Sequence, residues 1–83
     1  MKKVIVYSML NCPFCVKAKN VLTQRGVPYT VEMIDDWADD KWEAFEKKSG
    51  MKTVPQIYVD DKLLGGYTQL AEIDEKDKLE SLK

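Results

Sequence analysis

The sequence contains no histidine, two cysteines, and no hydrophobic run long enough to cross a bilayer. The absence of histidine excludes catalysis by Ser–His or Cys–His pairs and any histidine-ligated metal site. Two cysteines are too few for the disulfide framework of a small secreted domain. A membrane-spanning helix needs about 20 consecutive apolar residues, so we expect no membrane partner.

The chain also lacks an excess of positive charge. It has 13 Lys and Arg against 14 Asp and Glu, for a formal net charge of -1. A basic surface that could contact phosphate backbones is therefore missing, and we expect no nucleic-acid partner. The chain has 83 residues, of which 45% are hydrophobic, enough for one modest core. Residues 1–83 are accordingly predicted to form a single domain.

The N-terminal segment combines two lysines with an apolar run, as the start of a signal peptide does. A small-residue cleavage site should follow such a run, but the chain continues into Asn11-Cys12-Pro13. We therefore interpret the run as a buried strand and expect a cytoplasmic protein.

Hydrophobic periodicity and turn residues divide the chain into alternating strands and helices. A strand is expected over residues 3–8, followed by a helix that begins at Pro13 and stops at Gly26. The other expected elements are a strand over 29–34, a helix opening in the acidic stretch 35–40 and stopping at Gly50, strands over 56–59 and 62–64, and a helix over 68–83. The first strand–helix–strand unit predicts parallel strands with a right-handed crossover. The fold class is therefore α/β, a four-stranded mixed sheet flanked by helices in the order β-α-β-α-β-β-α.

Two of the helices carry a stripe of residues that we expect to face the core. In the first helix, helical spacing puts Cys15, Ala18 and Leu22 on one face. In the second helix the expected inner stripe is Ala38, Trp42, Phe45 and Ser49.

Cys12 and Cys15 stand at Cys-X-X-Cys spacing between the first strand and the first helix. Thiol–disulfide exchange proceeds through a thiolate. At the helix N-cap, Cys12 would face unpaired N–H groups and the positive end of the helix dipole, which predicts a lowered pKa. Cys15 lies on the inward face, where burial keeps its thiol protonated. We therefore predict a thiol–disulfide oxidoreductase in which Cys12 attacks and Cys15 resolves the mixed disulfide.

Two other interpretations of the cysteine pair stay open. The pair could be half of a zinc site completed by carboxylates, or two inert thiols in the core. The Thr53-Val54-Pro55 segment favours the redox interpretation, because a proline before a strand is a natural place for a cis peptide bond. Such a bond would aim the backbone of Val54 at a substrate held on Cys12, whereas an ordinary trans proline is the commoner alternative.

Three motifs together make the chain resemble a glutaredoxin over nearly its whole length, Val4 to Leu82: Cys12-Pro13-Phe14-Cys15, Thr53-Val54-Pro55-Gln56-Ile57-Tyr58-Val59 and Gly65-Gly66. The resemblance implies a thioredoxin-like fold, a cis Pro55, and glutathione as co-substrate, with no metal expected. It also implies Cys12 as nucleophile and Cys15 as resolving thiol. Phe14 replaces the tyrosine that is common in the family.

The resemblance further implies a glutathione groove between the active-site helix, the Thr-Val-Pro segment and the residues after the glycine pair. Val54 would pair with the cysteinyl backbone of glutathione, and Thr68 and Gln69 would lie near its γ-glutamyl end. The expected glutathione contacts are Pro13, Phe14, Lys52, Thr53, Val54, Pro55, Gly66, Tyr67, Thr68 and Gln69.

Two departures from the family pattern predict weakened glutathione binding. Met9 stands where many members have a lysine that meets the glycyl carboxylate. Thr68 and Gln69 stand where many members carry acidic residues that hold the γ-glutamyl ammonium. Each lost charged hydrogen bond costs about 1.5–3 kcal/mol when it is well desolvated. Lys52 would either supply a positive charge from the other side of the groove or be an exposed loop lysine.

The leading hypothesis is reduction of protein disulfides or glutathione mixed disulfides by a monomer. Its partners would be glutathione and disulfide-containing proteins, among which ribonucleotide reductase is a common client of the family. One alternative is a thioredoxin-like redoxin recharged by a flavoprotein reductase. Another is a glutathione-assisted [2Fe–2S] cluster carrier, which Pro13 disfavours because cluster-binding relatives usually have glycine there. Met9, Leu10 and Phe14 would form an apolar rim, either the edge of the core or a docking surface for protein disulfides.

Overall fold

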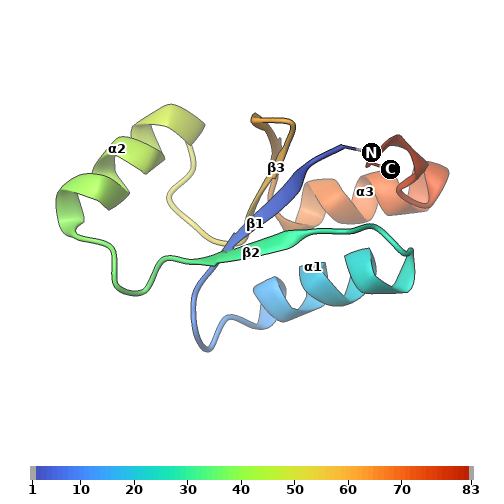
Figure 1. Ribbon diagram of the computed structural model, residues 1–83, viewed down its shortest axis with the longest axis horizontal. Helices are drawn as coiled ribbons and strands as arrows, with labels where there is room; N and C mark the ends of the chain where they lie inside the picture. Colours follow the sequence, from blue (N-terminus) through green and yellow to red (C-terminus); the bar gives the residue numbers. More distant parts are fainter. Residues whose placement is uncertain (1, 83) are drawn as a thin grey trace.

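The computed structural model describes residues 2–82, which form one four-stranded sheet flanked by helices (Figure 1). The elements, in chain order, are β1 (Val4–Ser8), α1 (Pro13–Gln24), β2 (Thr30–Met33), α2 (Asp39–Ser49), β3 (Gln56–Val59), β4 (Lys62–Gly65) and α3 (Tyr67–Asp77), followed by a short 3-10 helix, Glu80–Leu82. The strand and helix order predicted from the sequence is thus confirmed. None of the helices within residues 2–82 has the length and apolar character needed to span a membrane.

The sheet has the strand order β2-β1-β3-β4. β1 pairs in parallel with β2, as the crossover through α1 predicted, and antiparallel with β3. β3 and β4 form a hairpin whose two turn residues, Asp60 and Asp61, have positive φ angles of 50° and 67°. Positive φ at both central residues is the type I′ geometry that matches the twist of antiparallel strands.

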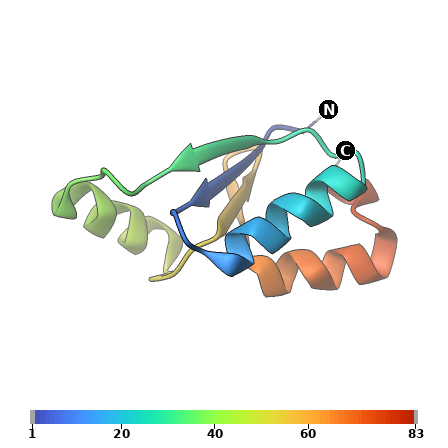
Figure 2. The same ribbon diagram turned by 90° about the horizontal axis from the view of Figure 1, so that it is seen from below.

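The main core lies between the sheet and the pair α1 and α3, which run side by side on one face (Figure 2). Ala18 and Leu22 of α1 and Leu70 of α3 are fully buried there, as predicted from helical spacing for α1. Because side chains alternate along a strand, Val6 and Ile57 meet these helices from the sheet.

The opposite face of the sheet carries aromatic residues that hold α2. Tyr7 of β1 and Tyr58 of β3 pack against Phe45 of α2, with the Tyr7 and Phe45 ring centroids 4.7 Å apart. Trp37 and Trp42 complete the cluster around Phe45. No residue of α2 is fully buried, so ring contacts rather than an aliphatic stripe attach this helix.

Three expectations about element boundaries and burial were wrong. Ala38 is the exposed N-cap of α2 rather than part of its inner stripe, since the helix begins only at Asp39. The last helix ends at Asp77, because Lys78 and Leu79 adopt positive φ angles that break it. The chain then folds back so that Leu79 and Leu82 enter the core. The second strand is also shorter than expected, and its four residues are all exposed. Lys83 lies outside the described residues.

A dithiol and groove at the start of the first helix

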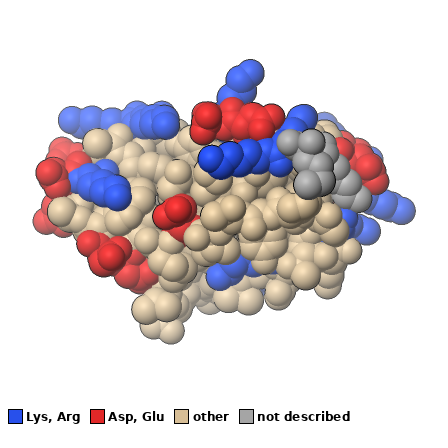
Figure 3. Space-filling view, viewed as in Figure 1, with Lys and Arg blue, Asp and Glu red and all other residues tan. Residues whose placement is uncertain are grey.

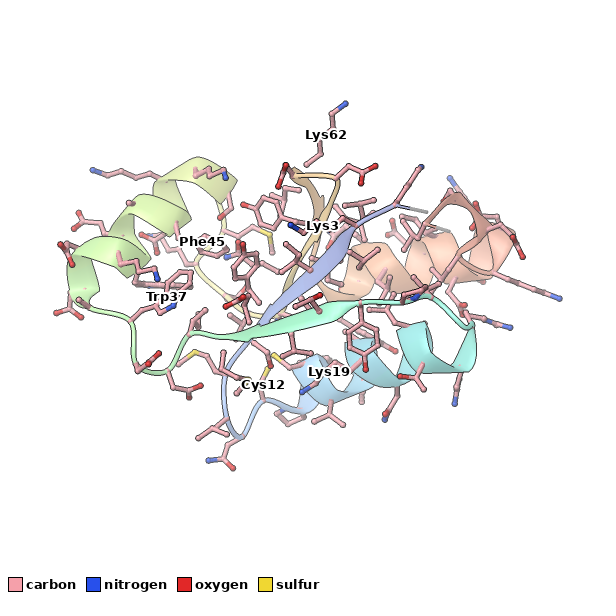
Figure 4. All side chains as sticks on the ribbon, viewed as in Figure 1. Lys3, Cys12, Lys19, Trp37, Phe45 and Lys62 are labelled. Atoms are coloured by element: carbon pink, nitrogen blue, oxygen red, sulfur yellow. The ribbon has the colours of Figure 1, made fainter. Side chains whose placement is uncertain are left out.

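The turn between β1 and α1 places Cys12 at the N-cap of α1. Asn11 takes a positive φ of 58°, which Asn tolerates better than most residues, and Cys12 is extended with φ and ψ of -109° and 102°. Pro13 occupies the first helical position, where a missing N–H costs no helical hydrogen bond. The Sγ atom of Cys12 accepts a hydrogen bond from the backbone N–H of Cys15 at 3.3 Å. The nucleophile predicted from the sequence therefore also caps its own helix (Figure 4).

The two cysteines differ in exposure, as predicted. Cys12 is partly exposed, whereas Cys15 is 1% exposed and begins the buried face that Ala18 and Leu22 continue. Both are free thiols in this structure. An accessible sulfur and a sheltered one thus lie within a single helical turn.

Opposing contacts act on the acidity of Cys12. Desolvation by the surrounding groups raises the pKa of the Cys12 thiol, and the neighbouring Cys15 thiol raises it further. The backbone N–H groups of Cys15 and Phe14 lower it. The net direction in the reduced protein is upward, so the lowered pKa expected from the N-cap position is not supported. The stabilising N–H groups are present, but desolvation and the second thiol outweigh them while both cysteines are reduced.

The peptide bond between Val54 and Pro55 is cis, as the resemblance implied. The loop before β3 lies against the active-site turn, where the carbonyl oxygen of Val54 accepts a hydrogen bond from Cys12 Sγ at 3.8 Å. The backbone of Val54 therefore lies directly beside the sulfur that would hold a substrate.

Gln56 holds this loop from inside the protein. Its side chain is completely buried, and its Nε2 donates hydrogen bonds to the carbonyl oxygens of Met51, at 3.2 Å, and Thr53, at 3.0 Å. Among residues 2–82 its Oε1 atom has no hydrogen-bond partner. Gln56 was not expected to be a functional residue. The only indication in the sequence was its single amide side chain, directly after Pro55, in an otherwise apolar strand.

A groove of about 350 Å³ runs alongside the active-site turn, between the loop before β3 and the start of α3. Its lining contains eight of the ten expected contacts and one residue that sequence analysis missed: Phe14, Met51, Thr53, Val54, Pro55, Gly66, Tyr67, Thr68 and Gln69. The lining carries no charged side chain. Met51 belongs to none of the sequence motifs. Only its position between the end of α2 and the Thr-Val-Pro segment indicated that it could line the groove.

Two expected contacts, Pro13 and Lys52, do not line the groove. Pro13 is exposed at the first position of α1, and Lys52 is an exposed residue of the loop before β3. Lys52 is thus an exposed loop lysine whose side chain is not part of the groove lining in this structure.

The glycine pair shapes the far wall of the groove. Gly66 is the N-cap of α3, and its N–H donates to Oε1 of Gln69 at 2.8 Å. That hydrogen bond occupies the side-chain carbonyl oxygen of Gln69 within the protein. A Cβ on Gly66 would lie 3.3 Å from the carbonyl oxygen of Pro55, so the absence of a side chain lets α3 approach the cis-proline loop.

A dithiol at a helix N-terminus, with a cis-proline loop beside the attacking sulfur, defines a thiol–disulfide oxidoreductase. The glutaredoxin family model matches residues 4–64. The chain belongs to the glutaredoxin family, and its sheet and helices have the thioredoxin-like fold.

Individual relatives agree with this assignment. Glutaredoxin 1 of Rickettsia conorii is 38% identical over 80 residues, which are 95% of this chain and 78% of that protein. Glutaredoxin 3 of Escherichia coli is 38% identical over 82 residues, which are 99% of this chain and 98% of that protein. The crystal structure of the buckwheat glutaredoxin–glutathione complex superimposes with a TM-score of 0.86 at 25% identity, covering 98% of this chain and 76% of that one.

Proposed function

We propose that this glutaredoxin uses glutathione to reduce protein disulfides and glutathione mixed disulfides through Cys12 and Cys15. The observation that carries the proposal is the groove beside Cys12, bounded by Val54 and by the N-terminus of α3. A tripeptide in this groove can place its cysteine next to Cys12 Sγ and pair its backbone with that of Val54. The glutathione complex of the buckwheat relative supports the same ligand for this fold.

The groove residues suit the backbone of a tripeptide better than its charged ends. The first N–H groups of α3 have no partner within the helix and favour an anionic group, so they can receive a carboxylate. Thr68 and the amide nitrogen of Gln69 offer neutral hydrogen bonds near the same place. With no Lys or Arg in the lining, we expect weaker glutathione binding than in members with charged contacts there.

The chemistry with a glutathione mixed disulfide needs one sulfur of the protein. The Cys12 thiolate attacks the glutathione sulfur, the disulfide of the substrate breaks, and the substrate leaves as a thiolate that takes up a proton. Cys12 is then joined to glutathione. A second glutathione thiolate attacks the bound glutathione sulfur, which releases glutathione disulfide and regenerates Cys12. The net reaction consumes one free glutathione thiol, whose sulfur joins the glutathione of the substrate in glutathione disulfide while the substrate sulfur is released as a thiol.

The chemistry with a protein disulfide uses both cysteines. After Cys12 forms a mixed disulfide with the substrate, Cys15 loses its proton and attacks Cys12 Sγ. The second substrate sulfur leaves, and a Cys12–Cys15 disulfide remains. Two glutathione molecules then reduce this disulfide and are themselves oxidised to glutathione disulfide.

Steady-state reduction of a small glutathione mixed disulfide, coupled through glutathione reductase, tests the proposal on wild type, Cys12→Ser and Cys15→Ser. We expect turnover in wild type and Cys15→Ser and none in Cys12→Ser, because only Cys12 is needed for this substrate. Activity that survives in Cys12→Ser would refute the assignment of the nucleophile.

The uncharged groove also favours one second candidate, a redoxin recharged by a flavoprotein reductase. The same proteins distinguish the two candidates. If wild type shows no turnover with glutathione but reduces insulin disulfides with a thioredoxin reductase, the electron donor is a flavoprotein, and the glutathione proposal fails.

A further inference from the structure

A second hollow, of about 240 Å³, lies at the end of β2 next to the turn that precedes Cys12. We call it the acidic hollow, and it is lined by Met9, Ile34, Asp35, Trp37, Asp39 and Trp42. It shares no lining residue with the groove described above. Its floor is apolar, and its two polar lining side chains are both carboxylates.

A residue that lines the acidic hollow is hydrogen-bonded to the active-site turn. The carboxylate of Asp35 accepts two contacts from the backbone N–H of Leu10, at 3.0 and 3.2 Å. This hydrogen bond links the segment after β2 to the residues just before Cys12. On the other side, Trp37 packs edge-on against Phe45 and Tyr7, which fixes one wall to the sheet and to α2.

The lining of the hollow contains two carboxylates and no Lys or Arg side chain that would neutralise them. Within the part of the chain that the structure describes, no Lys or Arg nitrogen forms an ion pair with Asp35 or Asp39. Lys41 Nζ lies 4.3 Å from the ring centroid of Trp37, a cation–π contact in which this indole attracts positive charge. Figure 3 shows Asp and Glu atoms at the end of the molecule that carries α2, together with Lys or Arg atoms, and further Asp and Glu atoms elsewhere on this face.

Exposed apolar residues continue from the hollow to the dithiol. Met9 is 41% exposed, Leu10 69% and Phe14 54%. Met9 lines the hollow and precedes Cys12 by three residues, so their Cα atoms are at most about 11 Å apart. An extended chain advances about 3.3 Å per residue. A peptide whose cysteine is joined to Cys12 therefore reaches the hollow with its second and third residues away from that cysteine.

We infer that the acidic hollow docks the segment of a protein substrate that flanks its target cysteine, and that it prefers an apolar side chain followed by Lys or Arg. The apolar side chain fits against Met9, Ile34 and the tryptophans, and the cation meets Asp35 and Asp39. The inference rests on the proposed reduction of protein disulfides and adds the substrate class to it. The hollow and the glutathione groove have different lining residues, although Met9 stands at the position that meets the glycyl carboxylate of glutathione in many family members.

Binding can be measured without any redox step. The chain has two tryptophans, and both line the hollow, so their indole N–H signals in an NMR spectrum report its occupancy. The probes are the peptides Lys-Leu-Gly-Ser-Gly-Leu-Lys and Glu-Leu-Gly-Ser-Gly-Leu-Glu, in which serine replaces the target cysteine and the symmetric sequence makes chain direction irrelevant. We expect both indole signals to shift with the lysine peptide, with an affinity about five- to tenfold higher than for the glutamate peptide.

Two variants of α2 make a matched pair. Asp39 lines the hollow and Asp40 does not, yet both lie in the first turn of the helix. Asp39→Lys should abolish the preference between the peptides, because its ammonium group balances the remaining carboxylate of Asp35, whereas Asp40→Lys should retain the preference. The milder Asp39→Asn should reduce the preference about two- to threefold, and added salt should weaken it in the wild type.

Three results would overturn the inference. The first is equal affinity of wild type for the two peptides, and the second is binding that leaves both indole signals in place. The third is a concentration-dependent dimer that Asp39→Asn dissolves, because a second copy of the chain would then occupy the hollow. Reduction of a small glutathione mixed disulfide by the same samples reports separately on the proposed function, so a failure of one is distinguishable from a failure of the other.

Discussion

Replacing Gly65 by alanine tests how the far wall of the glutathione groove is built. Gly65 ends β4 with a φ of +133°, a conformation that residues with a side chain rarely adopt. An alanine Cβ would lie 2.6 Å from Cγ of Gln69 and 2.8 Å from its Cδ and Oε1. The Gln69 side chain would have to move, and its hydrogen bond to the N–H of Gly66 would be lost.

The expected cost has two parts. A strained backbone conformation costs about 1–3 kcal/mol, and a lost N-terminal helix cap costs about 1 kcal/mol. We therefore predict that Gly65→Ala lowers the free energy of unfolding by about 2–4 kcal/mol. For a domain of this size each kcal/mol corresponds to about 4–8 °C in Tm, so the effect should be large in a thermal melt.

A double-mutant cycle with Gln69→Ala separates the two parts. Urea unfolding, followed by circular dichroism, gives the free energy of unfolding for wild type, each single variant and the double variant. Once Gln69 is truncated, alanine at position 65 no longer meets the Cγ, Cδ and Oε1 atoms of Gln69, and the backbone strain remains as its main cost. We expect Gly65→Ala to be about 1 kcal/mol less damaging in the Gln69→Ala background. An equal cost in both backgrounds would refute the proposed contact between Gly65 and the Gln69 cap.

Two further predictions concern the core and the surface. Leu22 is fully buried between α1 and the sheet, so Leu22→Ala should lower the free energy of unfolding by about 2–5 kcal/mol in urea titrations; a loss below 1 kcal/mol would contradict this packing. The hydrogen bond and ion pair from Arg25, 2.6 Å away, lower the pKa of Asp74. Their contribution is therefore present above the ordinary Asp pKa of about 4 and disappears as the pH falls through the lower folded value. The stability difference between wild type and Asp74→Asn should shrink between about pH 5 and pH 2, and a difference that stays constant would count against the pair.

Most of the fold could be predicted because local signals agreed with it. Pro13 and Gly26 mark the two ends of α1, and the spacing of Cys15, Ala18 and Leu22 identifies its buried face. The β-branched residues of β1 identify a strand at the centre of the sheet. These features depend on residues close together in the chain, which is why sequence patterns report them.

The parts that could not be predicted depend on contacts between distant segments. Ala38 fitted the periodicity of α2, but that helix is held by aromatic rings from β1 and β3 that periodicity does not show. The burial of Leu79 requires the chain to break its last helix, and no glycine or proline marks that point. In the site, the N-cap position of Cys12 and the burial of Cys15 could be predicted from their spacing and the proline between them. The roles of Met51 and Gln56 arise from the path of the loop before β3.

The direction of the Cys12 pKa shift could not be predicted from the sequence for the same reason. The N-cap position correctly identified backbone N–H groups that stabilise a thiolate. It did not report the desolvation and the second thiol that act against them. The helix-capping rule gave one contribution to the pKa of Cys12. The net direction of the pKa shift depends on all the groups packed around the sulfur.

In the proposed function, Cys12 alone carries the covalent intermediate with glutathione. The mass of the Cys15→Ser variant after reaction with glutathione disulfide shows whether it does. We predict one glutathione per chain, located on Cys12 by peptide mapping and removed by excess free glutathione. An unmodified Cys15→Ser protein, or a Cys12→Ser protein that acquires glutathione on Cys15 at a similar rate, would contradict the account.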